Sequence, residues 1–316
     1  MSTHIDDFRP QRVAILLATY QGGGNLRAQL DSYVSQTRPV DLILASDDGS
    51  TDDTREILAQ FSARHPDTPL RVIDGPKQGS ARNFLSLMQR VPDDIDVVAF
   101  SDQDDVWLPE KTARGLAALN AASVDLPVLY CARTWECDAD LSNRRVSTPR
   151  SCPACFEHAL VQNIAGGNTM MLNRAAVDLT RITAANVGHV AVHDWWAYQI
   201  ITGAGGQVVY DPDPVLLYRQ HPQNVIGANR GFLAKLRRLR AMLGGTLREW
   251  TTQNIAALRA ARAHLSDENN LRLEQFAQAR DGGLLARLRL MRDPGIFRQG
   301  RIGQLSLALA LALRRL

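Results

Sequence analysis

The chain has 316 residues, of which 45% are hydrophobic and 22% are charged. This composition is typical of a globular protein and excludes a disordered or fibrous chain. Residues 1–230 contain 20 basic and 27 acidic residues and carry a net charge of −7, whereas residues 231–316 contain 16 basic and 6 acidic residues and carry +10. Because the first part is acidic and shows no recognised binding motif, no nucleic-acid partner is expected.

The chain shows no sign of secretion or of a membrane-spanning helix. Residues 1–11 are polar and lack the apolar core of a signal peptide. The longest apolar run, 305–313, is about half the length that a membrane-spanning helix needs. Free cysteines suit a reducing compartment, so we expect a cytoplasmic protein. A single Cys-x-x-Cys pair, Cys152 and Cys155, is weak evidence for a zinc site even with His158 nearby, so no zinc site is expected.

Strand and helix patterns alternate in the first 122 residues. Each strand pattern is followed by a helical one, which predicts a mostly parallel sheet with helices on both faces. In such sheets ligands bind at the carboxyl ends of the strands. The strands are expected at residues 12–19, 42–45, 71–73 and 96–100.

Polar residues follow the first three strands. Asp47 and Asp48 end the second strand, where carboxylates accept hydrogen bonds from a nucleotide base or ribose. The loop after the first strand, 20–25, contains three glycines without the Gly-x-Gly-x-x-Gly spacing, and we interpret it as a flexible loop beside a ligand. Arg82 opens the helix after the third strand, and it suits either a phosphate contact or an ordinary surface position.

Three carboxylates crowd the end of the fourth strand. Asp102, Asp104 and Asp105 repel one another, which favours a divalent cation as partner. Residues two apart project to the same side of an extended chain, so Asp102 and Asp104 can share one ion. The alternative is a solvated acidic turn before a helix that starts near Pro109.

The second half of the predicted domain is less regular. A fifth strand is expected at 128–132, and short strands at 208–210 and 215–219. Residues 164–174 form a glycine loop that suits either a substrate lying close to the backbone or a plain turn. Asp194 starts a helix beside two tryptophans, where it is either a helix N-cap or a general base with a raised pKa. His221 is either a structural residue or a third metal ligand.

Together these motifs resemble the inverting family 2 glycosyltransferases of the GT-A fold, in the family's order over residues 12 to about 227. The acidic loop and the ending Tyr-Arg-Gln-His-x-x-Asn are most similar to the bacterial rhamnosyltransferase-type branch used in cell-surface polysaccharides. The matching segments are Ala18-Thr19-Tyr20-Gln21, Asp47-Asp48-Gly49-Ser50-Thr51-Asp52, Phe100-Ser101-Asp102-Gln103-Asp104-Asp105, Gly166-Gly167-Asn168, His193-Asp194-Trp195-Trp196 and Tyr218-Arg219-Gln220-His221.

The resemblance implies a metal-dependent enzyme that transfers a sugar from a dTDP- or UDP-linked donor to a glycan or lipid-linked acceptor. Mg²⁺ or Mn²⁺ would neutralise the leaving diphosphate, and Asp194 would act as the base. His193 stands where the family often carries an acid, and a histidine would not raise the pKa of the base as a carboxylate does. The implied contacts are Thr19, Tyr20, Asp47, Asp48, Arg82, Asp102 and Gln103 for the donor, Asp102, Asp104 and His221 for the metal, and Gly167, Asn168, Trp195 and Trp196 for the acceptor.

We therefore expect an α/β catalytic domain of the GT-A type at 1–230, followed by an all-helical region at 231–316. The domain would comprise a nucleotide half at 12–122 and an acceptor half at 123–230. The basic helices of the tail would pack on this domain, on a partner subunit such as a second copy, or on the anionic inner membrane. Two alternatives are a sugar-nucleotide nucleotidyltransferase, whose basic phosphate loop is missing at 20–25, and a non-catalytic sugar-nucleotide-binding subunit.

Overall fold

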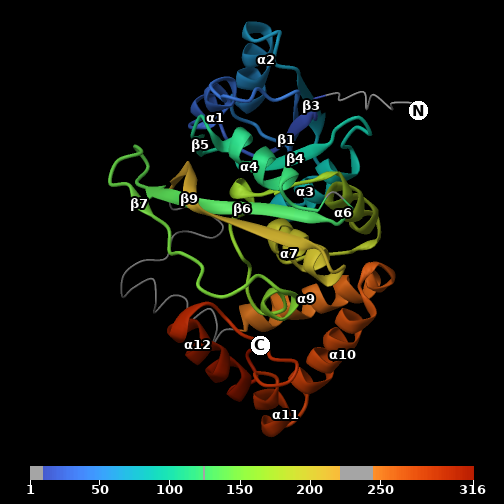
Figure 1. The fold of residues 1–316 in the computed structure, drawn as a ribbon. Coiled ribbons are helices and arrows are strands. Elements are labelled where there is room, and N and C mark those ends of the chain that lie inside the picture. The colour runs from blue at the N-terminus through green and yellow to red at the C-terminus, as the bar shows by residue number, and fades with distance from the viewer. Residues whose placement is uncertain (1–9, 124, 221–244) are drawn as a thin grey trace, which may run out of the picture.

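The computed structural model describes residues 10–123, 125–220 and 245–316 (Figure 1). Within these residues a curled sheet of nine strands carries helices on both faces, and a group of helices follows it. This arrangement confirms the predicted α/β class with a helical C-terminal region. The expected metal ligand His221 and the first amphipathic segment of the tail, 232–243, lie outside the described residues.

The predicted strand-then-helix units form the first part of the sheet. Their strands lie parallel in the order β3-β2-β1-β4, so all four carboxyl ends meet at one edge. The strands are β1 (Val13–Thr19), β2 (Leu42–Asp47), β3 (Leu70–Asp74) and β4 (Val97–Ser101), and the helices are α1 (Leu26–Val34), α2 (Thr54–Arg64), α3 (Ser80–Gln89) and α4 (Lys111–Asn120).

Successive residues of β1 enter different cores. Ala14 and Leu16 pack in the core on one face of the sheet, whereas Val13, Ile15 and Leu17 pack in the core on the other. Side chains of a strand alternate between its two faces, so a strand covered on both sides needs an unbroken apolar run. This requirement explains why the sequence of the first strand is an unbroken apolar run.

The sheet continues beyond β4 as a mixed sheet. Its order is β4-β8-β6-β9-β5, with β8 antiparallel to both of its neighbours and β9 parallel to β6. These strands are β5 (Val106–Trp107), β6 (Val128–Cys137), β8 (Met171–Leu172) and β9 (Gln207–Arg219), and β7 (Arg145–Val146) pairs with β6.

The two strands predicted at 208–210 and 215–219 are a single strand, β9, so that prediction was wrong. Register shifts opposite Ala132, Arg133 and Trp135 interrupt its pairing with β6. Pro212 and Pro214 lie at this point, and proline removes a ladder hydrogen bond. The sequence reads as two strands because the irregularity breaks the apolar pattern without ending the strand.

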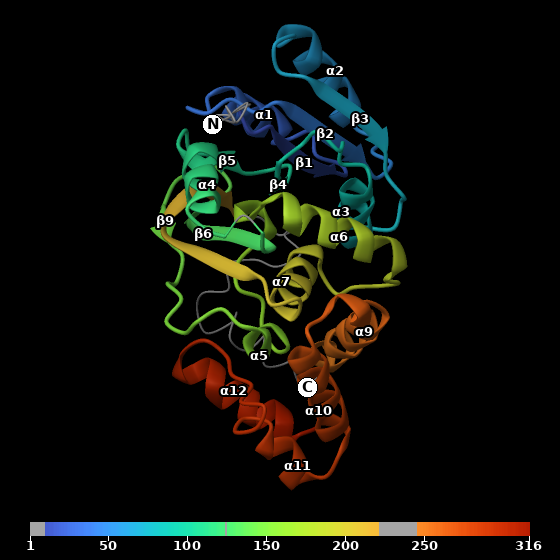
Figure 2. The ribbon, with the colours of Figure 1, turned by 45° about the vertical axis from the view of Figure 1, so that its right-hand side comes forward.

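Helices of residues 156–203 lie against the sheet (Figure 2). All eleven residues of α7 (His193–Gly203) are buried, as expected for a helix inside a core rather than on its surface. It contacts α3, α5, α6 and β6. The other elements are α5 (Phe156–Ala159), the 3₁₀ turn η1 (Gly167–Thr169) and α6 (Arg174–Asn186).

The C-terminal helices lie at the opposite end of the molecule from α2 (Figures 1 and 2). They are joined to the sheet domain through α7 and α9, where the rings of Trp195 and Trp250 meet edge to face at 6.4 Å. In the described part of the chain no helix has the length and apolar character to cross a bilayer. The helices are α9 (Thr246–Ala260), η2 (Arg262–His264), α10 (Asp267–Asp281), α11 (Leu284–Arg289) and α12 (Gly300–Ala312).

Candidate functional site

Thr19 and Asp47 lie side by side at the carboxyl ends of β1 and β2. The Thr19 hydroxyl donates to Asp47 Oδ1 at 3.1 Å, and the backbone and hydroxyl of Ser50 also donate to this carboxylate. Burial alone would raise the pKa of Asp47, but these bonds and the Arg55 guanidinium hold it below its ordinary value. Asp47 therefore orders the strand ends as an ionised acceptor.

Asp48 orders the loop between β3 and α3. Its Oδ1 accepts from the Lys77 amide at 2.6 Å, and its Oδ2 accepts from the Gly79 amide at 2.8 Å. A Cβ on Gly75 would lie 2.8 Å from Oδ1, so this loop approaches the carboxylate too closely for a side chain. Asp48 thus sits at the predicted nucleotide edge, and its contact with a base or ribose stays a prediction.

Gln103 connects the acidic loop to the loop after β1. Its Oε1 accepts from the Tyr20 amide at 2.8 Å, and its Nε2 donates to the Tyr20 carbonyl at 2.9 Å. A Cβ on Gly22 would lie 2.4 Å from Gln103 Oε1. Close packing therefore explains a glycine at this position, where we expected a flexible loop. The Tyr20 ring is 58% exposed and open to a ligand.

Arg82 contacts the segment between α6 and α7. Its guanidinium donates to the carbonyls of Val187 and Gly188 at 3.3 and 2.9 Å, between α6 and α7. These bonds join the start of α3 to the segment that follows α6. Its phosphate contact stays a prediction without support from the geometry.

The acidic loop and the expected base lie in one site. Burial, together with the charges of Asp104 and then Asp194, raises the pKa of Asp102 to about 7. Such an effect requires the three carboxyl groups to be close together. Asp102 is half-buried, and both the metal site and the acidic turn stay predictions for this loop.

Asp194 lies in the first turn of α7 but is not its cap. The N-cap is Val192, so the N-cap alternative is wrong. Asp194 Oδ2 accepts from the Gly167 amide at 2.9 Å, and Oδ1 accepts from the Trp195 amide at 2.6 Å. Burial raises the pKa of Asp194 to about 6, although both bonds favour its ionised form. A carboxylate with this pKa suits a general base near neutral pH.

His193 is a buried neutral residue. It stacks on Phe84 with ring centroids 3.6 Å apart and meets Phe100 edge to face. Burial lowers the pKa of His193 to about 3, and neither ring nitrogen has a hydrogen-bond partner in the described part of the chain. The neutral histidine adds no charge beside Asp194, and burial is the main cause of the raised pKa of Asp194.

The residues predicted to bind the acceptor are mostly enclosed. Trp195 and Trp196 are 4% and 1% exposed, and the Trp195 indole donates to the Ala159 carbonyl at 2.6 Å. A Cβ on Gly167 would lie 2.6 Å from His193 Nε2, so the missing side chain allows α7, rather than a ligand, to pack against this residue. Asn168 is 4% exposed. Acceptor contacts at these four residues stay predictions that the geometry does not support.

A buried polar cluster lies behind the acidic loop. The Asn168 amide donates to Asp105 Oδ2 at 2.6 Å, and Lys111 Nζ donates to the Asn168 carbonyl. Burial favours the neutral form of both side chains. It raises the pKa of Asp105 and lowers the pKa of Lys111. The Arg219 guanidinium donates to the Asp104 carbonyl at 2.9 Å and so connects the end of β9 to the same loop.

Three residues of this site, Gln21, Lys111 and Arg219, were given no role from the sequence, and Asp105 was named only as one of the three crowded carboxylates. Gln21 has a φ of +51° and accepts from the Thr51 amide at 2.8 Å. Lys111 offered a signal, because a lysine at the first residue of a helix opposes the helix dipole. The contacts of Asp105 and Arg219 join distant parts of the chain and left no local signal.

The structure brings together two of the predicted metal ligands, Asp102 and Asp104. Among the described residues no group of three or more His, Cys, Asp or Glu side chains is arranged to hold a metal ion. The predicted third ligand, His221, lies beyond β9 and outside the described part. His158 Nδ1 lies 2.9 Å from the Tyr198 hydroxyl, and Cys152 and Cys155 are free thiols.

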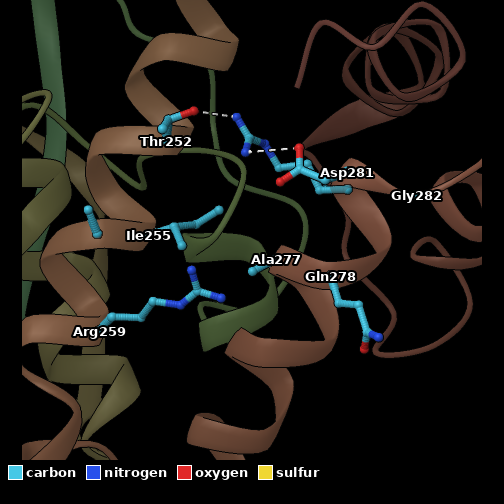
Figure 3. Close-up of a pocket in the computed structure, with 9 residues that line it drawn as sticks. Thr252, Ile255, Arg259, Ala277, Gln278, Asp281 and Gly282 are labelled. Carbon is cyan, nitrogen blue, oxygen red and sulfur yellow. Dashed lines mark hydrogen bonds and ion pairs between the residues drawn. The ribbon is translucent and has the colours of Figure 1, made fainter.

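A hollow of about 520 Å³ lies elsewhere, between α9 and α10 (Figure 3). Ile255 and Ala277 line it, and the guanidinium of Arg280 donates to Thr252 at its edge. Arg259, also on its wall, is paired with Glu274. None of the predicted site residues lines this hollow, so it is separate from the carboxyl-terminal edge of the sheet.

The fold is that of the GT-A glycosyltransferases. It matches the mannosyltransferase PcManGT from Pyrobaculum calidifontis, solved with GDP-Man and Mn²⁺, at a TM-score of 0.52 and 17% identity, covering 98% of this chain and 88% of that one. It also matches residues 1–349 of S. aureus TarS at a TM-score of 0.53 and 12% identity, over 96% and 89% of the two chains. The sheet edge with the buried Asp194 and the acidic loop is thus set in a glycosyltransferase fold.

The sequence comparisons give the family. The family model described as glycosyl transferase family 2 matches residues 14–168, which include the strand ends and the acidic loop. A dTDP-rhamnosyl transferase from Shigella flexneri, RfbG, is 26% identical over 266 residues, covering 80% of this chain and 87% of the relative. The chain belongs to glycosyl transferase family 2 and is a glycosyltransferase.

Proposed function

We propose that the protein transfers L-rhamnose from dTDP-β-L-rhamnose to a hydroxyl of a cell-surface polysaccharide or lipid-linked oligosaccharide, with inversion at the sugar. The similarity to the Shigella flexneri dTDP-rhamnosyl transferase supports this donor because it extends over most of both chains. UDP-linked hexoses are the alternative donors. Family membership disfavours the nucleotidyltransferase alternative, and loss of turnover on changing Asp194 would exclude a non-catalytic subunit.

Asp194 is proposed as the base that takes the proton of the acceptor hydroxyl. Its burial and its pKa of about 6 support this role, because the group is ionised at neutral pH yet close to the value needed to accept a proton. One base acting on one attacking hydroxyl produces inversion, whereas retention needs a carboxylate that forms a covalent intermediate. The Gly167 and Trp195 amides hold both oxygens of the base in place.

Asp102 and Asp104 are the proposed ligands of Mg²⁺ or Mn²⁺, with His221 as a predicted third. The donor set fits, because carboxylate oxygens are preferred by both ions and a cation relieves the repulsion that raises the pKa of Asp102. When bound, the cation neutralises charge developing on the leaving diphosphate. Asp105 is a less suitable ligand, since its Oδ2 is occupied by the Asn168 amide.

A thermal-shift panel tests the donor. We expect dTDP-rhamnose, and not UDP-glucose, UDP-galactose or GDP-mannose, to raise the melting temperature, with Mn²⁺ or Mg²⁺ but not with EDTA. A ligand present at 100 times its Kd and bound only by the folded state adds about 2.7 kcal/mol to the free energy of unfolding. A shift with a UDP-sugar alone would reassign the donor, and equal shifts in EDTA would contradict the metal-bridged site.

The proposed cellular place is the cytoplasmic face of the inner membrane. Four large apolar side chains of α12 and its C-cap, separated by three or four positions, form one exposed stripe, and α11 adds three more. Exposed arginines lie on these two helices or within a few residues of their ends, so the surface suits an anionic bilayer. The apolar residues are Leu284, Leu285, Leu288, Ile302, Leu305, Leu309 and Leu313, and the arginines are Arg289, Arg292, Arg301, Arg314 and Arg315.

Vesicle sedimentation tests this surface. The protein is expected to pellet with phosphatidylglycerol-containing vesicles more than with phosphatidylcholine vesicles, and less at high salt. Burying one leucine side chain in the bilayer contributes about 1.5–3 kcal/mol to the free energy of membrane binding. Ile302→Glu or Leu305→Glu should therefore weaken binding to the vesicles about ten-fold or more. Leu271→Glu, at an exposed leucine of α10 outside the stripe, is the control. A stable dimer whose dissociation follows the same substitutions would assign the surface to a second copy instead.

A further inference from the structure

Asp105, Lys111 and Asn168, which come from three separate elements, meet behind the acidic loop. Asp105 and Lys111 are fully buried and Asn168 is 4% exposed. The side chain of Asn168 donates to Asp105 and its carbonyl accepts from Lys111, so one residue bridges the carboxylate and the ammonium group. Asn168 is 63 residues from Asp105 and 57 from Lys111 along the chain, and the cluster therefore joins the acidic loop to the turn η1.

The position of Lys111 is unfavourable by itself. It is the first residue of α4, where the helix dipole disfavours a cation, and it is removed from water. Two contacts compensate: Nζ lies 3.2 Å from the centre of the Trp107 ring, and it donates to Asn168. A buried lysine with such specific partners fixes the position of η1 against α4.

The same turn holds the base. The amide of Gly167, one residue before Asn168, donates to Asp194 Oδ2 at 2.9 Å. The fit is close on this side as well, because a Cβ on Gly167 would lie 3.0 Å from the Asp194 Cβ. Movement of Asn168 therefore shifts the amide that orients Asp194.

We propose that Asn168 is a positioning residue, anchored by Lys111, that holds Asp194 at a set place relative to the acidic loop Asp102–Asp105. This inference rests on the proposed function, in which the loop binds the diphosphate end of the donor and Asp194 activates the acceptor. In-line attack requires the acidic loop and Asp194 to be fixed relative to the anomeric carbon of the donor sugar. A misplacement of about 1 Å lowers rates by about 10²-fold. Asn168 acts through Asp105 and Asp194 and need not touch a substrate.

The first test separates rate from binding. Asn168→Ala is expected to lower kcat for the donor identified above by about 10²-fold, with KM for the donor and the Kd of its nucleoside diphosphate with Mn²⁺ within about two-fold of the wild-type values. Asn269→Ala is the matched control, since it removes a buried amide that donates to the Thr202 and Gly203 carbonyls in another region. It should lower the melting temperature and leave kcat unchanged. Unchanged kcat in Asn168→Ala, or a loss explained by weaker diphosphate binding, would overturn the inference.

The second test exchanges the two partners. Asn168→Asp places two carboxylates together and should lose at least as much kcat as Asn168→Ala. Adding Asp105→Asn restores a donor and an acceptor with their roles reversed, and should recover about ten-fold or more of that loss. A double variant as slow as Asn168→Asp alone would show that the bond itself does not matter.

Hydrogen exchange gives a readout that needs no donor. In Asn168→Ala, amides of 166–170 and also of 193–197 are expected to exchange faster than in the wild type, whereas Asn269→Ala leaves both segments unchanged. Faster exchange confined to 166–170 would overturn the coupling to the base. If the wild-type protein turns over no tested donor while this exchange pattern is seen, the proposed function fails and the positioning contact stands.

Discussion

Asp194→Asn is expected to lower the rate of sugar transfer by about 10²–10⁴-fold, the usual contribution of a positioned general base. The substitution keeps the size of the side chain but removes its ability to accept the acceptor proton. Donor binding should persist, since the donor is proposed to contact the acidic loop and the strand ends. Initial rates with the donor from the thermal-shift panel, together with the Kd of the nucleoside diphosphate and Mn²⁺, measure both effects.

The pH profile gives a second signature of this residue. Burial raises the pKa of Asp194 to about 6, and the base works only when ionised. In the wild type kcat should therefore fall as the pH drops through about 6 and level off above it. Asp194→Asn should lose this dependence along with most of the rate.

Asp213→Asn is the control for these measurements, because Asp213 is an exposed carboxylate on β9 that pairs with Arg114. It should keep both the rate and the pH profile of the wild type. A rate for Asp194→Asn within about three-fold of the wild type, less than the usual contribution of a base, would remove Asp194 from the mechanism. If neither the wild type nor the variant turns over any donor, the non-catalytic binding subunit becomes the better interpretation.

Asp104→Ala is expected to abolish the metal-dependent stabilisation by the donor. At a donor concentration 100 times its Kd, about 2.7 kcal/mol of added stability should disappear. Asp104 lies close to Asp102, and its charge adds to the effect of burial in raising the pKa of Asp102. With one carboxylate gone, the remaining group holds a divalent cation poorly.

The melting temperature without ligand separates metal loss from misfolding. It should not fall in Asp104→Ala, because removing one of several crowded carboxylates relieves repulsion. Glu274→Ala, which breaks an exposed pair with Arg259 far from the loop, should leave the donor shift intact. Full stabilisation of Asp104→Ala by donor and Mn²⁺ would place the metal elsewhere.

Local patterns were enough to predict the first half of the fold. The strands β1, β2 and β4 are short and mostly apolar, each strand from β1 to β4 is followed by a helical repeat, and both signals depend on neighbours within a few residues. The mixed half was harder, because β8 has only two residues and β9 is interrupted near Pro212 and Pro214. Pairing of such segments depends on strands that are distant in the chain.

The sequence by itself determined the class of fold and which residue types stand at the strand ends, including Asp48, Asp102, Asp104 and Asp194. Those residues follow buried strands or start buried helices, so their positions are set locally. Only the tertiary structure decided what each one contacts. Asp47 serves its own loop, burial supplies the raised pKa of Asp194, and Asn168 turns inward to Asp105 and Lys111. Burial and long-range hydrogen bonds arise when the chain closes on itself, and no spacing along the sequence encodes them.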